Sequence, residues 1–137
     1  MIKKTLFISA FFLLTAFSLY LPFRDGKFSG KSKSIYTEEP YYGCTNITIE
    51  KGRMTQIDFL VRDSAKHVNF DAGYERYFAG NDAYITQCRN DWKGIQQYPD
   101  SLLKYQDLNK VDAMAGATWS HNLFKASVKE ALAKAKR

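Results

Sequence analysis

The feature that most constrains this chain is a run without any charged residue, which extends over residues 5–23. Its length is close to the roughly 20 residues that span a bilayer as a helix. The run follows a short basic start (1–4), is longer than a typical signal-peptide core and ends in no Ala-x-Ala cleavage site. These features favour an uncleaved signal anchor over residues 1–24, with cleavage near 16–18 as the alternative. The basic start predicts a single pass through the cell (inner) membrane, with the rest of the chain on the extracytoplasmic side.

The remaining residues, 25–137, are enough for one domain. Aromatic residues make up 15% of the chain and charged residues 25%, a composition typical of a packed domain rather than of disorder. The formal net charge is +6, but basic residues do not form a stripe interleaved with aromatic ones. The composition therefore gives no support to nucleic-acid binding.

A β-hairpin is predicted in the first half of the domain. Cys44–Glu50 alternates, with β-branched residues on one side, and Met54–Val61 has the pattern of a second strand. Lys51-Gly52 between them is a turn signal. Before the hairpin, the turn residues of 25–30 predict a turn and the polar stretch 31–40 predicts a loop.

The second half of the domain is predicted to be mainly helical. Asp71–Phe78 is expected to form a helix, 82–92 is ambiguous with helix favoured, and 99–105 is expected to be a short helix opened by its Pro-Asp-Ser start. The clearest helix starts at 118–120, because apolar residues then recur at helical period: Phe124, Val128, Ala131, Leu132 and Ala135. The predicted fold class is α+β, a small antiparallel sheet with packed helices, preceded by one N-terminal transmembrane helix.

Two cysteines and two histidines offer little for metal chemistry. Cys44 and Cys88 have no metal-binding spacing, and His67 and His121 lie far from both in sequence. In an extracytoplasmic domain the cysteines could be bridged, so a disulfide and two buried thiols both stay open. His121, one turn into the last helix, is expected to be a surface polar residue.

A loop of small residues, 111–120, stands at the start of the last helix. Gly116 and the neighbouring alanines would let a ligand approach the backbone. The first N–H groups of a helix lack intrahelical partners and the helix dipole favours an anion there, so the loop suits a phosphate. The alternative is that Thr118 or Ser120 is simply an N-cap and that the small residues pack tightly.

The same loop carries a family resemblance. Its sequence D-A-M-A-G-A-T at 112–118 resembles the flavinylation motif of the FMN-binding domain family, with Ala at a position usually held by Ser or Thr. That family includes the C subunit of the sodium-pumping NADH:quinone reductase and the G subunit of the Rnf complex. The stretch D-G-K-F-S-G at 25–30 and the hairpin are similar to the family's opening and central strands. The Glu-Thr-Pro-Gly-Leu-Gly stretch of Rnf-type subunits is missing from 62–110, so a small stand-alone, membrane-anchored member fits better.

This resemblance implies FMN held covalently through a phosphoester on Thr118, attached by a separate Mg-dependent flavin transferase that uses FAD. Asp112 would help to present the loop to that transferase. The cofactor-binding residues that the resemblance implies are Thr118 as the acceptor, with Asp112, Ala115, Gly116, Ala117, Trp119 and Ser120 around it.

The implied function is an electron-transfer flavoprotein with an unidentified redox donor and acceptor, more a carrier than a self-contained enzyme. Candidates to flank the flavin ring are Trp119, Tyr41, Tyr42 and Trp92. Two alternatives stay open: a small reductase that binds FMN non-covalently, and a cofactor-free envelope binding module.

Overall fold

The computed structural model describes residues 22–32 and 38–137 of the chain. The predicted anchor over residues 1–24 therefore lies almost wholly outside the described residues. Among the residues that are described, no helix has the length and hydropathy needed to cross a membrane. The elements, in chain order, are β1 (Gly26–Lys31), β2 (Tyr41–Glu50), β3 (Arg53–Asp63), β4 (Val68–Asn69), the 3₁₀ helix η2 (Tyr74–Phe78), α1 (Asp82–Tyr105), the 3₁₀ helix η3 (Leu108–Lys110) and α2 (Thr118–Ala135).

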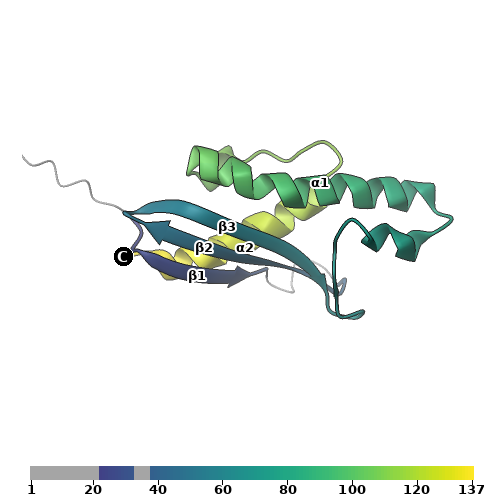
Figure 1. The fold of residues 1–137 in the computed structure, drawn as a ribbon, viewed down its shortest axis with the longest axis horizontal. Helices are drawn as coiled ribbons and strands as arrows, with labels where there is room; N and C mark the ends of the chain where they lie inside the picture. Colours follow the sequence, from purple (N-terminus) through teal and green to yellow (C-terminus); the bar gives the residue numbers. More distant parts are fainter. Residues whose placement is uncertain (1–21, 33–37) are drawn as a thin grey trace, which may run out of the picture.

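The four strands form one antiparallel sheet in the order β1-β2-β3-β4 (Figure 1). The predicted hairpin is confirmed, and both of its strands are longer than the sequence pattern indicated. Lys51 and Gly52 make the turn with positive φ angles of 51° and 74°. The β-branched residues Thr45, Ile47 and Ile49 all face the core, as the alternation predicted.

The turn expected at 25–30 is wrong, because most of this stretch is strand β1. Its residues pair with β2, for example Phe28 with Ile47. The Asp25 carboxylate accepts hydrogen bonds from the amides of Lys51 and Gly52, which ties the start of β1 to the hairpin turn. Gly30, one of the glycines that suggested a turn, lies against helix α2 instead.

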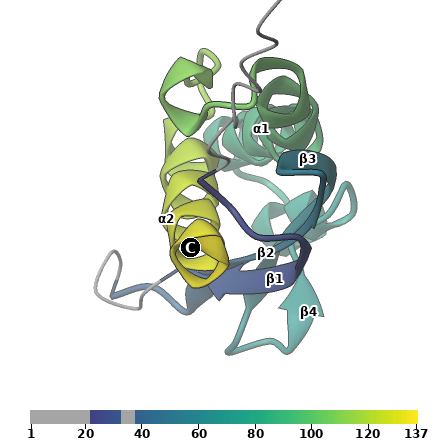
Figure 2. The same ribbon diagram turned by 90° about the vertical axis from the view of Figure 1, so that its left-hand side faces the viewer.

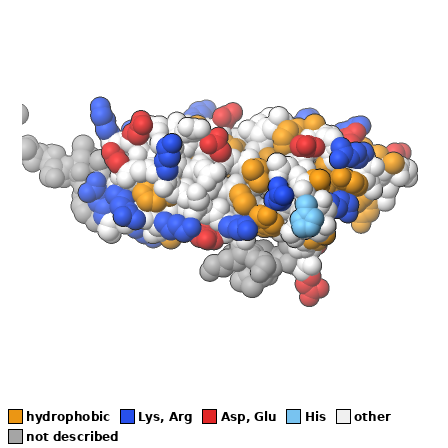
Figure 3. Space-filling model, turned by 60° about the horizontal axis from the view of Figure 1, so that its bottom comes forward, with side chains coloured by type: hydrophobic (Ala, Val, Ile, Leu, Met, Phe, Trp, Pro, Cys, Tyr) orange, Lys and Arg blue, Asp and Glu red, His pale blue; other side chains and the backbone are white. Residues whose placement is uncertain are grey.

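Both helices lie on one side of the curved sheet (Figure 2). Helix α2 packs on β1 and β2, whereas α1 packs on β3. One core cluster joins side chains from the sheet and from both helices, such as Ile47 of β2, Leu102 of α1 and Phe124 of α2. On the opposite side, Figure 3 shows Lys and Arg side chains gathered towards the end of the molecule where the C-terminus lies.

The two helical segments expected at 82–92 and 99–105 are a single helix, α1, with Pro99 inside it. A proline inside a helix lacks the N–H for one hydrogen bond and costs on the order of 3 kcal/mol. Here its neighbours Tyr98 and Leu102 are fully buried, and this packing offsets the local cost. The segment expected to be a helix at 71–78 contains only the short 3₁₀ helix η2.

The alternative of a Cys44–Cys88 disulfide is excluded, because both thiols are free. Cys44 alternates with the core-facing residues of β2 and so points to the outer face of the sheet, whereas Cys88 lies in a core cluster on the helix side. Burial raises the pKa of both thiols. Among the described residues there is also no group of ligands that could hold a metal ion.

Helix α2 approaches the sheet closely through glycine. A methyl group on Gly30 would collide with the Ser127 carbonyl oxygen and come within 2.5 Å of the Ala131 amide nitrogen. A methyl group on Gly43 of β2 would lie 2.9 Å from the Leu123 carbonyl oxygen. The buried hydroxyls of Thr45 and Ser127, 2.5 Å apart, join the same two elements.

We expect Gly30→Ala to lower the free energy of unfolding by about 3 kcal/mol, because backbone atoms of α2 cannot yield to the added methyl group. Chemical denaturation of the purified chain measures the loss. Lys27→Ala, on the exposed side of the same strand, is the control and should change stability by no more than about 0.5 kcal/mol. Equal losses in the two variants would contradict the close packing of α2 on β1.

Candidate functional site

Buried side chains from α1 and α2 hold the loop that precedes α2. The Tyr98 hydroxyl donates to the Ala117 carbonyl at 2.9 Å and accepts from the Met114 amide at 3.1 Å. His121 Nε2 donates to the Val111 carbonyl at 2.6 Å, since a carbonyl can only accept. The expectation of a surface His121 is therefore wrong: its ring packs on Tyr98 and is only 8% exposed. Its polar neighbours in sequence gave no sign of this burial.

Gly116 is required by the shape of the loop. Its φ angle is +74°, and a methyl group at this position would lie 2.6 Å from Nδ2 of Asn90. Its carbonyl accepts a hydrogen bond from Gln87 Nε2 at 2.7 Å. Ala117 is fully buried, so its side chain packs inside the domain, whereas Ala115 is exposed. The loop is thus fastened to α1 on one side and open to solvent on the other.

The start of α2 has no hydroxyl cap of its own. Its N-cap residue is Ala117, which has no side chain that can accept a hydrogen bond, so the alternative that Thr118 or Ser120 is the N-cap is excluded. A carboxylate from α1 takes this role instead. Asp91 Oδ1 accepts from the amide of Ser120 at 3.1 Å and from its hydroxyl at 2.7 Å, and Asp91 Oδ2 accepts from Gln87 at 2.7 Å.

Thr118 is the first residue of α2, and its side chain is exposed. Asp112 is exposed as well, so another protein can reach both side chains. The amides of Thr118 and Trp119 belong to the first turn, in which a helix offers no acceptor of its own. The structure therefore places an accessible hydroxyl beside helix-terminal N–H groups, which is the arrangement that the sequence predicted.

A pocket of about 410 Å³ lies beside Trp119. This volume is within the range of small-molecule sites, about 300–1,000 Å³. We call it the aromatic pocket, and its lining residues are Glu39, Tyr41, Phe70, Phe78, Tyr84, Gln87, Asp91 and Trp119.

The rings of the aromatic pocket pack on one another. Trp119 lies edge-on to Tyr41 at 5.2 Å between ring centroids and 5.3 Å from Phe70. Phe78 and Tyr84 are stacked at 5.1 Å with an angle of 16° between their planes. Such a lining suits a flat aromatic ligand.

A buried hydrogen-bond chain supports the wall of this pocket. The Tyr41 hydroxyl donates to that of Tyr74 at 2.7 Å, and Tyr74 donates to the Asp63 carboxylate at 2.5 Å. Burial favours the protonated form of Asp63, but bonds from Tyr74 and from the amides of Lys66 and Ala65 outweigh it and hold its pKa below its usual range. Burial and the same chain raise the pKa of Tyr74. These hydrogen bonds fix the position of the Tyr41 ring, which faces Trp119.

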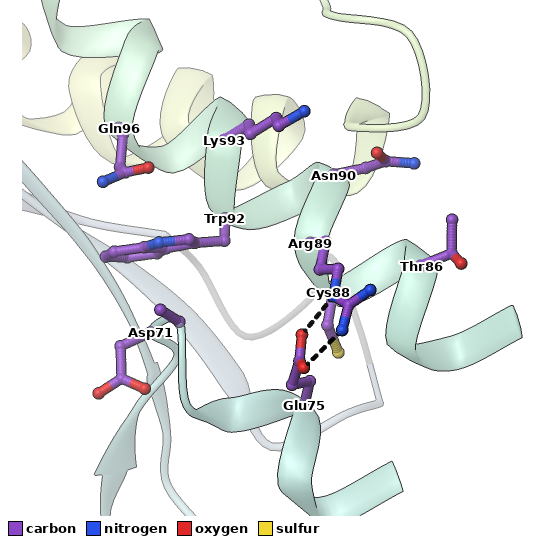
Figure 4. Close-up of a pocket in the computed structure, with 10 residues that line it drawn as sticks. Asp71, Glu75, Thr86, Cys88, Arg89, Asn90, Trp92, Lys93 and Gln96 are labelled. Atoms are coloured by element: carbon purple, nitrogen blue, oxygen red, sulfur yellow. Dashed lines mark hydrogen bonds and ion pairs between the residues drawn. The ribbon is translucent and has the colours of Figure 1, made fainter. Parts of the chain in front are cut away.

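A second cavity, of about 510 Å³, lies between η2 and the face of α1 that points away from the aromatic pocket (Figure 4). Most of its lining residues are polar or charged, among them Lys93 and the Arg89–Glu75 ion pair, whose two N···O distances are 2.7 and 2.9 Å. Trp92 lines it as well. We call it the polar cavity. None of its lining residues belongs to the loop 111–120, so it is separate from Thr118, the predicted attachment residue.

The structure thus divides the predicted ring neighbours. Trp119 and Tyr41 both line the aromatic pocket, Trp92 lines the polar cavity, and Tyr42 lies in neither. Sequence reasoning missed Asp91 and Gln87, which face the same pocket. The only local signal for this pair was their i, i+4 spacing, which puts both side chains on one face of a helix.

Removal of the Tyr98 hydroxyl should loosen the loop that presents Thr118. We expect Tyr98→Phe to cost about 1–3 kcal/mol of stability, because two backbone groups lose a buried partner. Thermal or chemical unfolding tests this, with Tyr105→Phe as the control, since Tyr105 is exposed on the same helix. If both variants were equally stable, the loop would not depend on the Tyr98 hydroxyl.

Comparison with solved structures supports the fold. A crystal structure of a Clostridium perfringens protein from a structural genomics consortium matches with a TM-score of 0.59 at 18% sequence identity. The match covers 80% of this chain and 87% of the other. At this identity the likeness concerns the fold alone. No curated protein matches the chain in sequence at a significant level.

Comparison with protein families is more specific. The FMN-binding domain family matches residues 44–133, about two thirds of the chain. The matched region runs from β2 into the last turn of α2 and includes the loop before Thr118 and most of the aromatic pocket. The chain therefore belongs to the FMN-binding domain family.

Proposed function

We propose that this protein is an extracytoplasmic, membrane-anchored electron carrier that holds FMN through a phosphoester on Thr118, with the flavin ring in the aromatic pocket. The observation that carries the proposal is the position of Thr118: an exposed hydroxyl at the start of α2, next to Trp119, whose ring lines that pocket. The family match supports FMN as the ligand.

The residues fit such a cofactor in two respects. Helix-terminal N–H groups beside Thr118 suit a phosphate, and the rings of Trp119, Tyr41 and Phe70 offer a surface for the flavin. When bound, FMN supplies the redox chemistry, and the protein supplies orientation and an electrostatic environment.

Attachment requires a partner. A Thr hydroxyl is a weak nucleophile at its own pKa. Among the described residues, no carboxylate or imidazole forms a hydrogen bond with the Thr118 hydroxyl that would activate it. A separate flavin transferase would break the pyrophosphate bond of FAD, join the FMN phosphorus to the Thr118 oxygen and release AMP. The exposed Asp112 and Ala115 give such an enzyme a surface to hold.

The arrangement of α2 also suits a membrane-anchored carrier. The Arg24 amide donates to the Ala135 carbonyl at 2.9 Å, so the point where the predicted anchor joins the domain lies at the end of α2. Thr118 begins the same helix, whose 18 residues span about 27 Å. A flavin on Thr118 would therefore lie far from the anchor, where external donors and acceptors can reach it.

Covalent attachment is tested by mass. Wild-type chain co-expressed with a flavin transferase should exceed the apoprotein mass by FMN less one water, and Thr118→Val should lose that addition completely. Thr86→Val, an exposed threonine on α1, is the control and should keep it.

Two results would contradict the assignment. Flavin that acid precipitation releases would indicate non-covalent binding, as in a small reductase. A colourless wild-type protein after transferase treatment would indicate a binding module without the cofactor.

The place of the ring is tested by flavin fluorescence. An indole close to the ring quenches its emission, so Trp119→Leu should raise fluorescence per bound flavin several-fold. Trp92→Leu alters the polar cavity instead and should leave the emission unchanged. The reverse pattern would move the ring from the aromatic pocket to the polar cavity.

A further inference from the structure

The charged side chains that line the aromatic pocket are acidic, although the net charge of the chain is +6. Its lining contains two carboxylates, Glu39 and Asp91. Of the residues that the structure describes, no Lys, Arg or His lines it. Any ligand ring in this pocket would therefore lie near the buried carboxylate of Asp91.

Asp91 is the buried member of this pair, with only 2% of its surface exposed. Its two oxygens accept three hydrogen bonds, two from Ser120 and one from Gln87. A carboxylate can accept all three of these bonds. Within the described part of the chain no Lys or Arg forms an ion pair with it, so its charge is stabilised by neutral donors and by the N-terminus of α2.

We propose that the buried Asp91 carboxylate lowers the reduction potential of the FMN that the function proposed above, on which this inference rests, places in the aromatic pocket. Full reduction of bound FMN by dithionite would add two electrons and one proton from water. The proton would form an N–H bond at N5, and a negative charge would remain on the ring at N1. A fixed negative charge nearby disfavours that product. Because Asp91 is itself buried, solvent screens its charge less than that of a surface carboxylate.

A purely structural role for Asp91 makes a different prediction. As the partner of the Ser120 amide and hydroxyl it stabilises the start of α2, and its removal would then change stability alone. The potential of the flavin distinguishes the two roles, because it reports the charge near the ring in protein that is already folded and loaded.

The experiment is a spectroscopic titration with dithionite and redox mediators on full-length chain loaded by a flavin transferase. Asp91→Asn keeps an oxygen for the Ser120 donors but removes the charge. We expect the equilibrium constant for two-electron reduction to rise about tenfold, a shift of ~30 mV to more positive potential. Asp100→Asn removes an exposed charge from the same helix and should leave the potential unchanged.

A second variant keeps Asp91 in place. In Gln87→Lys the ammonium group can donate to both the Asp91 carboxylate and the Gly116 carbonyl, so it replaces the bonds of Gln87 while it neutralises the charge. It should shift the potential in the same direction. If Asp91→Asn fails to fold, an unchanged potential in loaded Gln87→Lys still overturns the proposal.

The outcomes separate the two proposals. Positive shifts in the loaded variants support the role of Asp91, whereas wild-type potentials in them overturn it. Wild-type chain that takes up no covalent flavin overturns the proposed function instead, and intact mass shows this before any titration.

Discussion

The arrangement of this domain depends on the close contact of α2 with the first two strands. Gly30 and Gly43 leave room for the backbone of α2, and the Thr45–Ser127 hydroxyl contact fixes the helix along its length. A helix held this closely has one direction, so its two ends are placed with precision. Its C-terminal end meets the chain at Arg24, and its N-terminal end carries Thr118 to the far side of the domain.

The second constraint is the buried carboxylate at the start of that helix. Burial of a charge without a cation is costly, and it persists here because three donors and the helix dipole face Asp91. The same residue joins α1 to α2 and, through Gln87, to the Gly116 carbonyl. The fold and the candidate site therefore share one polar network, and a change in it affects both.

The parts of the fold that could be predicted are those with strong local periodicity. The hairpin and α2 follow from alternation and from the apolar stripe. The role of Thr118 stays a prediction, which rests on a motif that lies within one loop. Helix α1 was divided at Pro99 because the local cost of proline is readable and the burial of Tyr98 and Leu102 is not. The burial of His121 and the role of Asp91 likewise depend on contacts between segments that are distant in sequence.

The aromatic pocket shows why a site of this kind is not visible in one stretch of sequence. Its rings come from β2, the segment after β4, η2, α1 and α2, and each ring alone has the pattern of an ordinary core residue. They leave a pocket between η2, the start of α1 and the start of α2, with Tyr41 of β2 on the side of the sheet. The charges follow the helix: Asp91 lies at its N-terminal end, and Lys134, Lys136 and Arg137 lie at its C-terminal end. One helix dipole thus favours an acidic pocket at the proposed flavin end and basic residues at the end next to the predicted anchor.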